Sequence, residues 1–238
     1  MGVPHEHEPL AVPDAARFAD QMIGLVSHDL RNPLSTIEMG TQLLARGELG
    51  ARERRVLSHI ASANGRAQRL VADLLDLALV RFGHGLAVAP APVPLHTLVA
   101  ECVESLARTH TDALLEHDRL GEGVCHADAG RLVQLVGNLV ANAVAYGAPG
   151  RPVIVASIVE PDAFRVAVHN EGPPIAPERM PGLFEPAMAR STTPSGRTVG
   201  LGLFIVRQIA LAHGGDVQAR SDASGTTFTV SFRRDTEA

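Results

Sequence analysis

The sequence predicts an α+β protein, in which a helical hairpin that forms a dimeric four-helix bundle is followed by an α/β sandwich. Residues 14–81 show the apolar periodicity of two bundled helices, and residues 95–234 alternate between helical and strand-like patterns. A stretch rich in proline and glycine separates the two halves. With 238 residues, of which 45% are hydrophobic, the chain is long enough for two domains that each bury a core.

The first half reads as two helices joined by a short turn. From about Asp14 to Arg46, four apolar residues recur every seven positions: Ile23, Leu30, Ile37 and Leu44. After a turn at residues 47–50, a second helix is expected from about Arg52 to Arg81, with a four-three apolar alternation at Val56, Ile60, Ala63, Ala67, Leu70, Leu74 and Leu77. One hairpin buries too little of these stripes, so we expect a homodimer through residues 14–81, preceded by a flexible tail at residues 1–13.

The first helix carries a histidine that lies off its apolar seam. His28 is followed directly by Asp29, and the pair is therefore displayed next to each other on the helix surface. A carboxylate beside an imidazole is a typical arrangement for a nucleophile or a proton shuttle. An ordinary exposed helical histidine explains His28 equally well from these residues alone.

Residues 82–94 cannot continue the second helix, because five of them are glycine or proline: Gly83, Gly85, Pro90, Pro92 and Pro94. We expect a stiff, extended linker there. The sequence after it predicts helices at about 95–108, at 129–146 and after Gly202. It predicts strands at about 152–159, 164–168, 216–220 and 226–233, in a mostly antiparallel sheet.

Two asparagines mark the helix at 129–146 as a candidate binding element. Asn138 and Asn142 are four residues apart, so they share one helix face inside an apolar run. Asparagine is unfavourable in helix interiors, and amide oxygens suit a hard cation such as Mg²⁺. A pair of hydrogen-bonded buried amides is the alternative, with about equal weight.

Two glycine-containing turns accompany these asparagines. Asn170 follows the predicted strand at 164–168 and begins the turn of residues 170–175, where an amide followed by a glycine turn can meet the polar edge of a base. Gly200 and Gly202 stand at a helix start, where free N–H groups and the helix dipole favour phosphate. Such glycines are often only turn residues, and the combination with the asparagines favours a nucleotide site.

Composition argues against several other classes of protein. The net charge is −5 and no block of lysine or arginine is present, so nucleic acid is not an expected partner. No apolar run reaches the roughly 20 residues that cross a bilayer, so we expect no membrane segment and a cytoplasmic location. Cys102 and Cys125 lack metal-ligand spacing and are expected to be buried free thiols.

From about Phe18 to Phe232 the chain resembles the sensor histidine kinases of two-component signalling. Five segments occur in that family's order: residues 28–34 resemble the phosphoacceptor box, residues 138–146 the asparagine box led by Asp128 and Arg131, residues 170–175 the first glycine box, residues 183–186 the phenylalanine box, and residues 200–203 the second glycine box. The resemblance implies a dimerisation and histidine phosphotransfer domain at 14–81, a linker at 82–94, and a catalytic ATP-binding domain of the GHKL (Bergerat) type at 95–234.

The resemblance also implies site roles, cofactors and partners. His28 would accept the γ-phosphoryl group of ATP while Asp29 takes the proton, and Asn32 matches a position linked to dephosphorylation of the partner. Asn142 would bind Mg²⁺. Nucleotide contacts are expected at Asn138, Asn142, Tyr146, Asn170, Gly172, Ile175, Gly200, Leu201, Gly202 and Leu203. The partner would be the receiver domain of a response regulator, which takes the phosphoryl group on an aspartate.

The chain departs from the family pattern at four positions. Asn170 replaces an aspartate, Pro174 a glycine, Ala145 a basic residue and Ala187 a phenylalanine. An asparagine oxygen still accepts a hydrogen bond from the adenine amino group. These departures keep a second hypothesis open, namely a catalytically degenerate phosphotransfer or scaffolding dimer. An ATPase or serine kinase ranks last, because neither explains the hairpin and its histidine.

Overall fold

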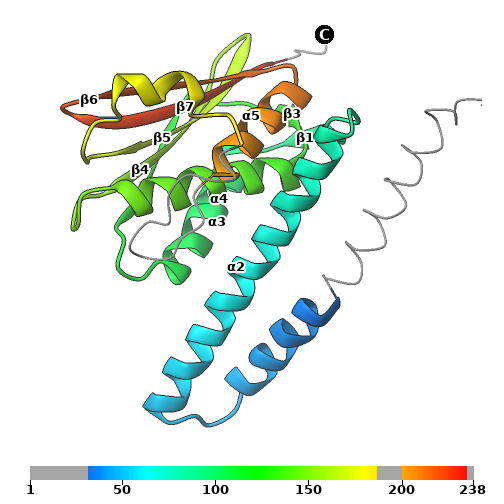
Figure 1. Cartoon of the computed structure of the whole chain (residues 1–238), viewed down its shortest axis with the longest axis vertical. Helices are drawn as coiled ribbons and strands as arrows, with labels where there is room; N and C mark the ends of the chain where they lie inside the picture. Colours follow the sequence, from blue (N-terminus) through cyan, green and yellow to red (C-terminus); the bar gives the residue numbers. More distant parts are fainter. Residues whose placement is uncertain (1–31, 187–199, 235–238) are drawn as a thin grey trace, which may run out of the picture. The chain divides into compact units, whose positions relative to one another are not determined.

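The computed structural model describes residues 32–186 and 200–234 of the chain (Figure 1). Contacts divide the chain into two compact units, residues 1–84 and residues 85–238. None of the described helices combines the length and the hydropathy that a bilayer-spanning helix requires. His28 and Asp29, Ala187, and the apolar residues Ile23 and Leu30 lie outside the described residues.

The first unit contains a helical hairpin. A helix over residues 32–45 leads through a turn into α2 (Ala51–Arg81), whose first turn is closed by Glu53 accepting from the Gly50 N–H at 2.7 Å. Asn64 Nδ2 donates to the Leu34 carbonyl at 2.9 Å across the hairpin, and Gln68 Nε2 donates to Glu38 at 3.0 Å. Polar contacts thus hold the two helices at a defined register.

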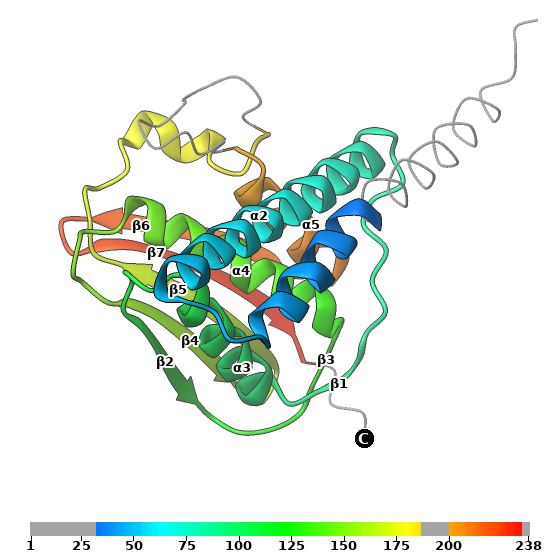
Figure 2. The same ribbon diagram turned by 90° about the horizontal axis from the view of Figure 1, so that it is seen from below.

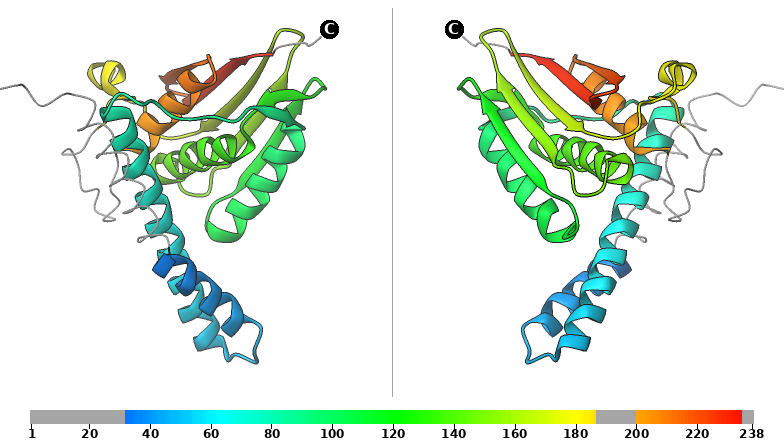
Figure 3. Two further views of the ribbon diagram at one scale, coloured as in Figure 1. Left: turned by 90° about the vertical axis from the view of Figure 1, so that its right-hand side faces the viewer. Right: turned by 90° about the vertical axis from the view of Figure 1, so that its left-hand side faces the viewer.

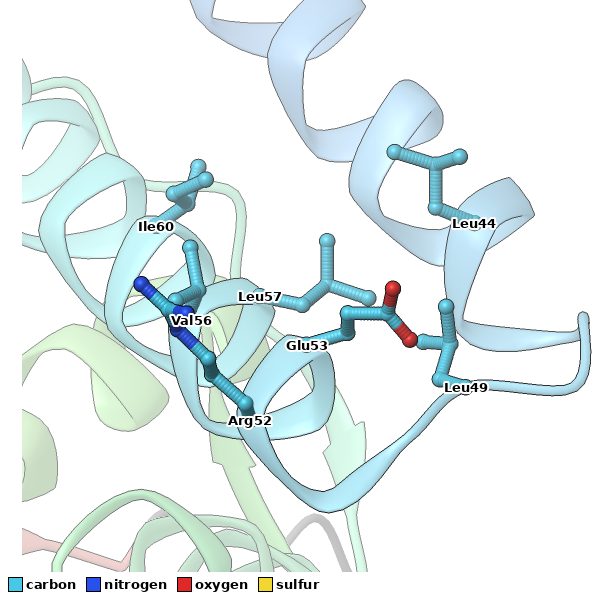
Figure 4. Close-up of a pocket in the computed structure, with 7 residues that line it drawn as sticks. All are labelled: Leu44, Leu49, Arg52, Glu53, Val56, Leu57 and Ile60. Carbon is cyan, nitrogen blue, oxygen red and sulfur yellow. The ribbon is translucent and has the colours of Figure 1, made fainter.

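Most large residues of the predicted α2 seam are exposed in the single chain. Val56, Ile60, Leu70 and Leu74 have between 42% and 52% of their surface exposed, whereas Leu77 is buried. Near the turn, a cavity of about 510 Å³ lies between side chains of the first helix, the turn and α2. Figure 4 shows the seven residues that line it: Leu44, Leu49, Arg52, Glu53, Val56, Leu57 and Ile60.

The second unit is an α/β sandwich built on a five-stranded sheet in the order β2-β4-β5-β7-β6 (Figure 1). The strands are β2 (Leu115–Leu120), β4 (Val153–Val159), β5 (Ala163–Asn170), β6 (Asp216–Asp222) and β7 (Gly225–Arg233). β2 runs parallel to β4 and the other pairs are antiparallel. The prediction of an α+β fold with a mostly antiparallel sheet is therefore confirmed.

Three helices cover one face of this sheet: α3 (Leu95–Thr109), α4 (Ala129–Tyr146) and α5 (Gly202–Ala212). Figures 2 and 3 show them as one layer against the strands. Alternate residues of β4 and β5 face the helices and are buried, as period-two alternation requires. At the far end of β5 from Asn170, Phe164 stacks on Phe232 with ring centroids 4.8 Å apart.

Three strands and a short helix were not predicted. β1 (Ala91–Val93) pairs with β3 (Cys125–Ala127) in a small antiparallel sheet, although its residues fall in the predicted linker. β2 and the 3-10 helix η1 (Pro177–Gly182) were also missed. Cys102 and Cys125 are free and buried as expected, and burial raises the pKa of the Cys102 thiol to about 11.

Candidate functional site

Helix α4 carries the two asparagines that the sequence singled out. Asp128 caps the helix by accepting from the Arg131 N–H at 3.1 Å, which fixes where the helical rotation begins. Leu135 and Leu139 are completely buried on its core face, whereas Asn138 and Asn142 are only partly buried. One turn apart, the two amides lie along the same side of the helix, next to the core residues.

The start of α5 lies against Asn138. A Cβ at Gly202 would be only 3.5 Å from Asn138 Cγ and 3.6 Å from its Oδ1, so the glycine leaves room there for the amide. Leu201, the N-cap residue of α5, has no side-chain acceptor, and the first N–H groups of the helix have no partner within the helix. Gly200, Leu201, Gly202 and Leu203 are all partly exposed. Within the part of the chain that the structure describes, this junction therefore offers backbone donors without an intrahelical partner beside an amide.

Asn138 holds a second indication of a ligand. Its Nδ2 is buried and has no hydrogen-bond partner. Among the described residues, one other buried side-chain atom lacks a partner, namely Asn64 Oδ1. A buried amide donor without a partner costs about 1–3 kcal/mol. Unpaired buried polar groups are uncommon in folded proteins and often mark a place where a ligand completes the pairing.

Asn170 ends β5 in a tightly packed setting. The residue is only 4% exposed, and its Nδ2 donates to the Glu171 carbonyl at 3.3 Å. Gly147 and Gly225 sit against it, since a Cβ at Gly147 would be 3.6 Å from Asn170 Cβ and one at Gly225 would collide with its carbonyl oxygen. Because Nδ2 is engaged, the side chain is set to present Oδ1 as an acceptor.

The turn after Asn170 is fixed to the end of α4. A Cβ at Gly172 would lie 2.6 Å from the Tyr146 carbonyl oxygen, so only glycine fits at this approach. The Ala148 N–H donates to the Glu171 carbonyl at 2.7 Å, and Arg151 pairs with the Glu171 carboxylate at 2.8 Å. Tyr146 itself is exposed. These contacts place the asparagine helix and the glycine turn side by side.

Two polar residues near Asn170 were not predicted from the sequence. Thr226 lies opposite Asn170 on β7, and Ser221 lies opposite Thr226 on β6. The Ser221 and Thr226 hydroxyls are 2.7 Å apart, and Ser221 Oγ accepts from the Ile175 N–H at 2.9 Å. Only strand register brings these residues together, so no local motif could have revealed them.

The phenylalanine segment is attached to the same region. Phe184 makes an edge-on contact with Phe228 of β7, with centroids 6.2 Å apart. Glu185 pairs with Arg207 of α5 at 3.3 Å. This segment therefore contacts both the sheet, at β7, and helix α5.

The described residues contain no cluster of three or more histidine, cysteine, aspartate or glutamate side chains that could hold a metal unaided. A Mg²⁺ site would therefore need oxygen ligands from a bound nucleotide in addition to the Asn142 amide. Such sharing is ordinary for Mg²⁺, which keeps few protein ligands when phosphates are present. The chemistry of the donors fits a metal that arrives with its nucleotide.

The predicted site residues thus fall into two groups. Asn138, Asn142, Tyr146, Asn170, Gly172, Ile175 and residues 200–203 all belong to the second unit, and the contacts above join α4, the turn after β5 and the start of α5. Asn32 belongs to the first unit, where it lies exposed near the start of the described helix. Its carbonyl accepts from the Thr36 hydroxyl at 3.0 Å.

Two protein families match the chain. Residues 19–83 match the family described as "His Kinase A (phospho-acceptor) domain". Residues 127–236 match the family described as "Histidine kinase-, DNA gyrase B-, and HSP90-like ATPase". The phosphoacceptor match comes first and covers the hairpin. The ATPase match follows and lies within the sandwich.

Curated relatives agree with these matches. The chain is 33% identical over 211 residues to a bacteriophytochrome of Pseudomonas aeruginosa, covering 87% of this chain and 29% of the relative. It is 34% identical over 215 residues to the probable sensor histidine kinase TcrY of Mycobacterium tuberculosis, covering 88% and 45%. The chain therefore spans less than half the length of either relative.

Among solved structures, full-length ShkA in complex with AMPPNP is similar with a TM-score of 0.65 and 23% identity, over 92% of this chain and 47% of that one. At this identity the similarity concerns the fold alone. The similarity supports a fold in which a helical hairpin is followed by an α/β sandwich.

Proposed function

We propose that this chain, which belongs to the sensor histidine kinases and has their phosphoacceptor hairpin and GHKL-type ATPase fold, phosphorylates its own His28 with ATP. The observation that carries the proposal is the contact of Gly202 with Asn138, whose buried Nδ2 has no partner. An unpaired donor beside free helix N–H groups is suited to the oxygens of a phosphate chain.

ATP would lie between the two glycine turns. The adenine amino group would donate to Asn170 Oδ1, near Thr226 and the turn of Gly172 and Ile175. The phosphates would reach residues 200–203 and Asn138, where the dipole of α5 favours negative charge. The AMPPNP bound in the ShkA structure is an ATP analogue, and its presence in a protein of this fold supports the choice of nucleotide.

Asn142 would supply the protein ligand of Mg²⁺, with the remaining ligands coming from phosphates and water. When bound, the metal would neutralise charge that develops on the phosphates. Asn138, one turn before it, would orient the phosphate chain. Both roles use amide oxygens and nitrogens that the fold leaves along one side of α4.

In the transfer step, a ring nitrogen of His28 would attack the γ-phosphorus of ATP. A nitrogen–phosphorus bond forms, the bond from that phosphorus to the bridging oxygen breaks, and ADP leaves. Asp29 would take the proton from the imidazole and orient the ring. The phosphohistidine would then pass the phosphoryl group to an aspartate of a response regulator.

Three finer proposals accompany this activity. The segment of residues 14–81 would form a homodimer, and residues 82–94 would link it to the catalytic domain at 95–234; the tail predicted at residues 1–13 lies outside the described residues. Asn32, one helical turn after His28, would orient a water that dephosphorylates the regulator, which makes the chain a phosphatase as well.

The test is incorporation of radiolabelled γ-phosphate by the purified chain with Mg²⁺. We expect an acid-labile, base-stable label that is lost in His28→Gln and at least tenfold weaker in Asn142→Ala. His59→Gln is the matched control, because His59 is an exposed helical histidine of α2 and should label normally. Labelling of His28→Gln at the wild-type rate, or no labelling of the wild type, would overturn the proposal.

Nucleotide titration separates the alternative of a degenerate scaffold from this proposal. A chain that fails to bind Mg-ATP but still binds a response regulator would be a phosphotransfer or scaffolding dimer. If the wild type binds Mg-ATP and Asn142→Ala does not, the degenerate scaffold is excluded, because a decayed site would not bind the nucleotide in the wild type.

A further inference from the structure

A polar cluster interrupts the core beside helix α3. Ser157 faces inward on β4 and is completely buried, at a position where its neighbours Val155 and Val159 are apolar. Its hydroxyl lies 2.6 Å from His96 Nδ1 of α3 and 2.9 Å from His117 Nε2 of β2. His96 Nε2 lies 2.9 Å from the Gly121 carbonyl oxygen, in the turn after β2.

These contacts allow one order of protons when both imidazoles are neutral. The Gly121 carbonyl only accepts, so His96 Nε2 carries a hydrogen and His96 Nδ1 is bare. The Ser157 hydroxyl must then donate to His96 Nδ1, and its oxygen accepts from the Nε2–H of His117. The chain of bonds therefore runs in a single direction from His117 through Ser157 and His96 to Gly121.

The surroundings of His117 favour its neutral form, and the cluster remains accessible from outside. Burial lowers the pKa of His117, and His96 and Arg119 lower it further, whereas Asp118 raises it. A cavity of about 400 Å³ lies beside the cluster and is lined by His96, Arg119, Gly121 and Glu122. Water can thus exchange protons with His96 from this cavity.

We propose that His96, Ser157 and His117 form a proton-sensitive latch that fastens β2 and its following turn to α3 and β4, and that opens on acidification. The inference concerns a different place from the nucleotide site and does not depend on the proposed activity. Three elements meet at one buried hydroxyl, and β2 is an edge strand whose other side has no neighbouring strand among the described residues.

The sign of the effect follows from the proton order. Protonation of His96 places an Nδ1–H against the Ser157 hydroxyl, so that the buried hydroxyl loses its acceptor. Protonation of His117 adds a charge next to His96, and two imidazolium ions around one hydroxyl repel each other. Because burial lowers the native pKa of His117, the latch contributes stability above the ordinary histidine pKa of about 6.5, and this stability is lost as the pH falls through the lower native pKa of His117.

The test uses the full chain and two substitutions that keep hydrogen-bonding groups but cannot titrate, His96→Gln and His117→Gln. We expect amide hydrogen exchange in β2, corrected for its intrinsic pH dependence, to accelerate about tenfold between pH 7.5 and 5.5 in the wild type. The double variant should lose this pH dependence. His59→Gln is again the matched control and should behave as the wild type.

Imidazole NMR gives a second readout that needs no opening event. In the wild type at neutral pH, His96 should carry its proton on Nε2, and His117 should titrate below the ordinary histidine pKa of about 6.5. Replacing His96 by glutamine should raise the midpoint of His117. Titration of His117 at about 6.5 that His96→Gln leaves unchanged, or β2 exchange in the double variant that accelerates as in the wild type, would overturn the latch.

Discussion

At the scale of single residues, Asn138 shows how a binding position conflicts with stability. Its neighbours on the core side of α4 are buried leucines and valines, and an apolar residue would fit that stripe better. Instead the helix keeps an amide whose Nδ2 has no partner. A residue that lowers stability by leaving a donor unpaired is expected where function requires it.

We therefore predict that Asn138→Leu stabilises the chain while it weakens nucleotide binding. Removing the unpaired donor should raise the free energy of unfolding by about 1 kcal/mol, measured in urea without nucleotide. The affinity for Mg-AMPPNP, measured by calorimetry, should fall at least tenfold, because the phosphate contact is lost. Gly137→Ala is the control, since its Cβ meets no atom within 4 Å and should leave the affinity unchanged. A variant that binds as tightly as the wild type would remove Asn138 from the site.

The residue scale also shows where prediction from sequence stops. Asn170 was chosen from its glycine turn, and the structure places it in a glycine-lined setting. Thr226 and Ser221 carry no such local signal, because they lie on strands distant in sequence, where register places Thr226 opposite Asn170 and Ser221 opposite Thr226. A short motif identifies the residue that begins a turn, whereas the residues across the sheet depend on the whole fold.

At the scale of elements, α4 is fixed at its start by one carboxylate. Asp128 accepts from the Ala89 N–H at 3.0 Å as well as from Arg131, and its own N–H donates to His213 Nε2 at 3.0 Å. The N–H groups of Ala89 and Arg131 lower the pKa of Asp128, against the opposing effect of burial. The same residue thus ties α4 to the segment before β1 and to the end of α5.

We predict that Asp128→Ala lowers the free energy of unfolding by about 1–2 kcal/mol at pH 7, the usual loss for an N-cap. Because the native pKa of the carboxyl is depressed, its contribution is present above about pH 4 and is lost as the pH falls through the lower native value. Urea unfolding of the wild type and of the variant from pH 7 to 3 should therefore converge. Asp112→Ala, in the exposed turn before β2, serves as the control, and curves of wild type and Asp128→Ala that stay parallel would contradict the assignment.

Helices and strands were predicted correctly where the apolar periodicity and the residues that start or end an element agree. Helix α4 has the predicted bounds, because an apolar period of 3.6 runs from a capping Asp128 to Gly147. β2 was missed because its sequence of Leu115–Leu120 contains three charged residues and follows the pattern of an exposed edge. β1 was assigned to the linker because Pro92 suggested a break, although proline is tolerated on a strand that pairs on one side only.

At the scale of the whole molecule, the hairpin leaves its apolar seam uncovered. Val56, Ile60, Leu70 and Leu74 are spaced along one stripe of α2, and each is about half exposed. Near the turn, Leu44 from the other helix lines a cavity together with Val56 and Ile60 (Figure 4). In a four-helix bundle, a second hairpin would cover a stripe of large apolar residues that are spaced in this way.

We predict that the chain is a dimer in solution and that Leu70→Glu combined with Leu74→Glu converts it to a monomer. Each leucine contributes about 1.5–3 kcal/mol when fully buried, and two buried carboxylates add a further penalty, so the dissociation constant should rise about a hundredfold or more. Light scattering at several concentrations measures the mass directly. Leu114→Glu is the control, because Leu114 is also an exposed leucine but belongs to the second unit and lies off the seam. If the double variant and Leu114→Glu have the same mass as the wild type at every concentration, the apolar seam of α2 is not a dimer interface.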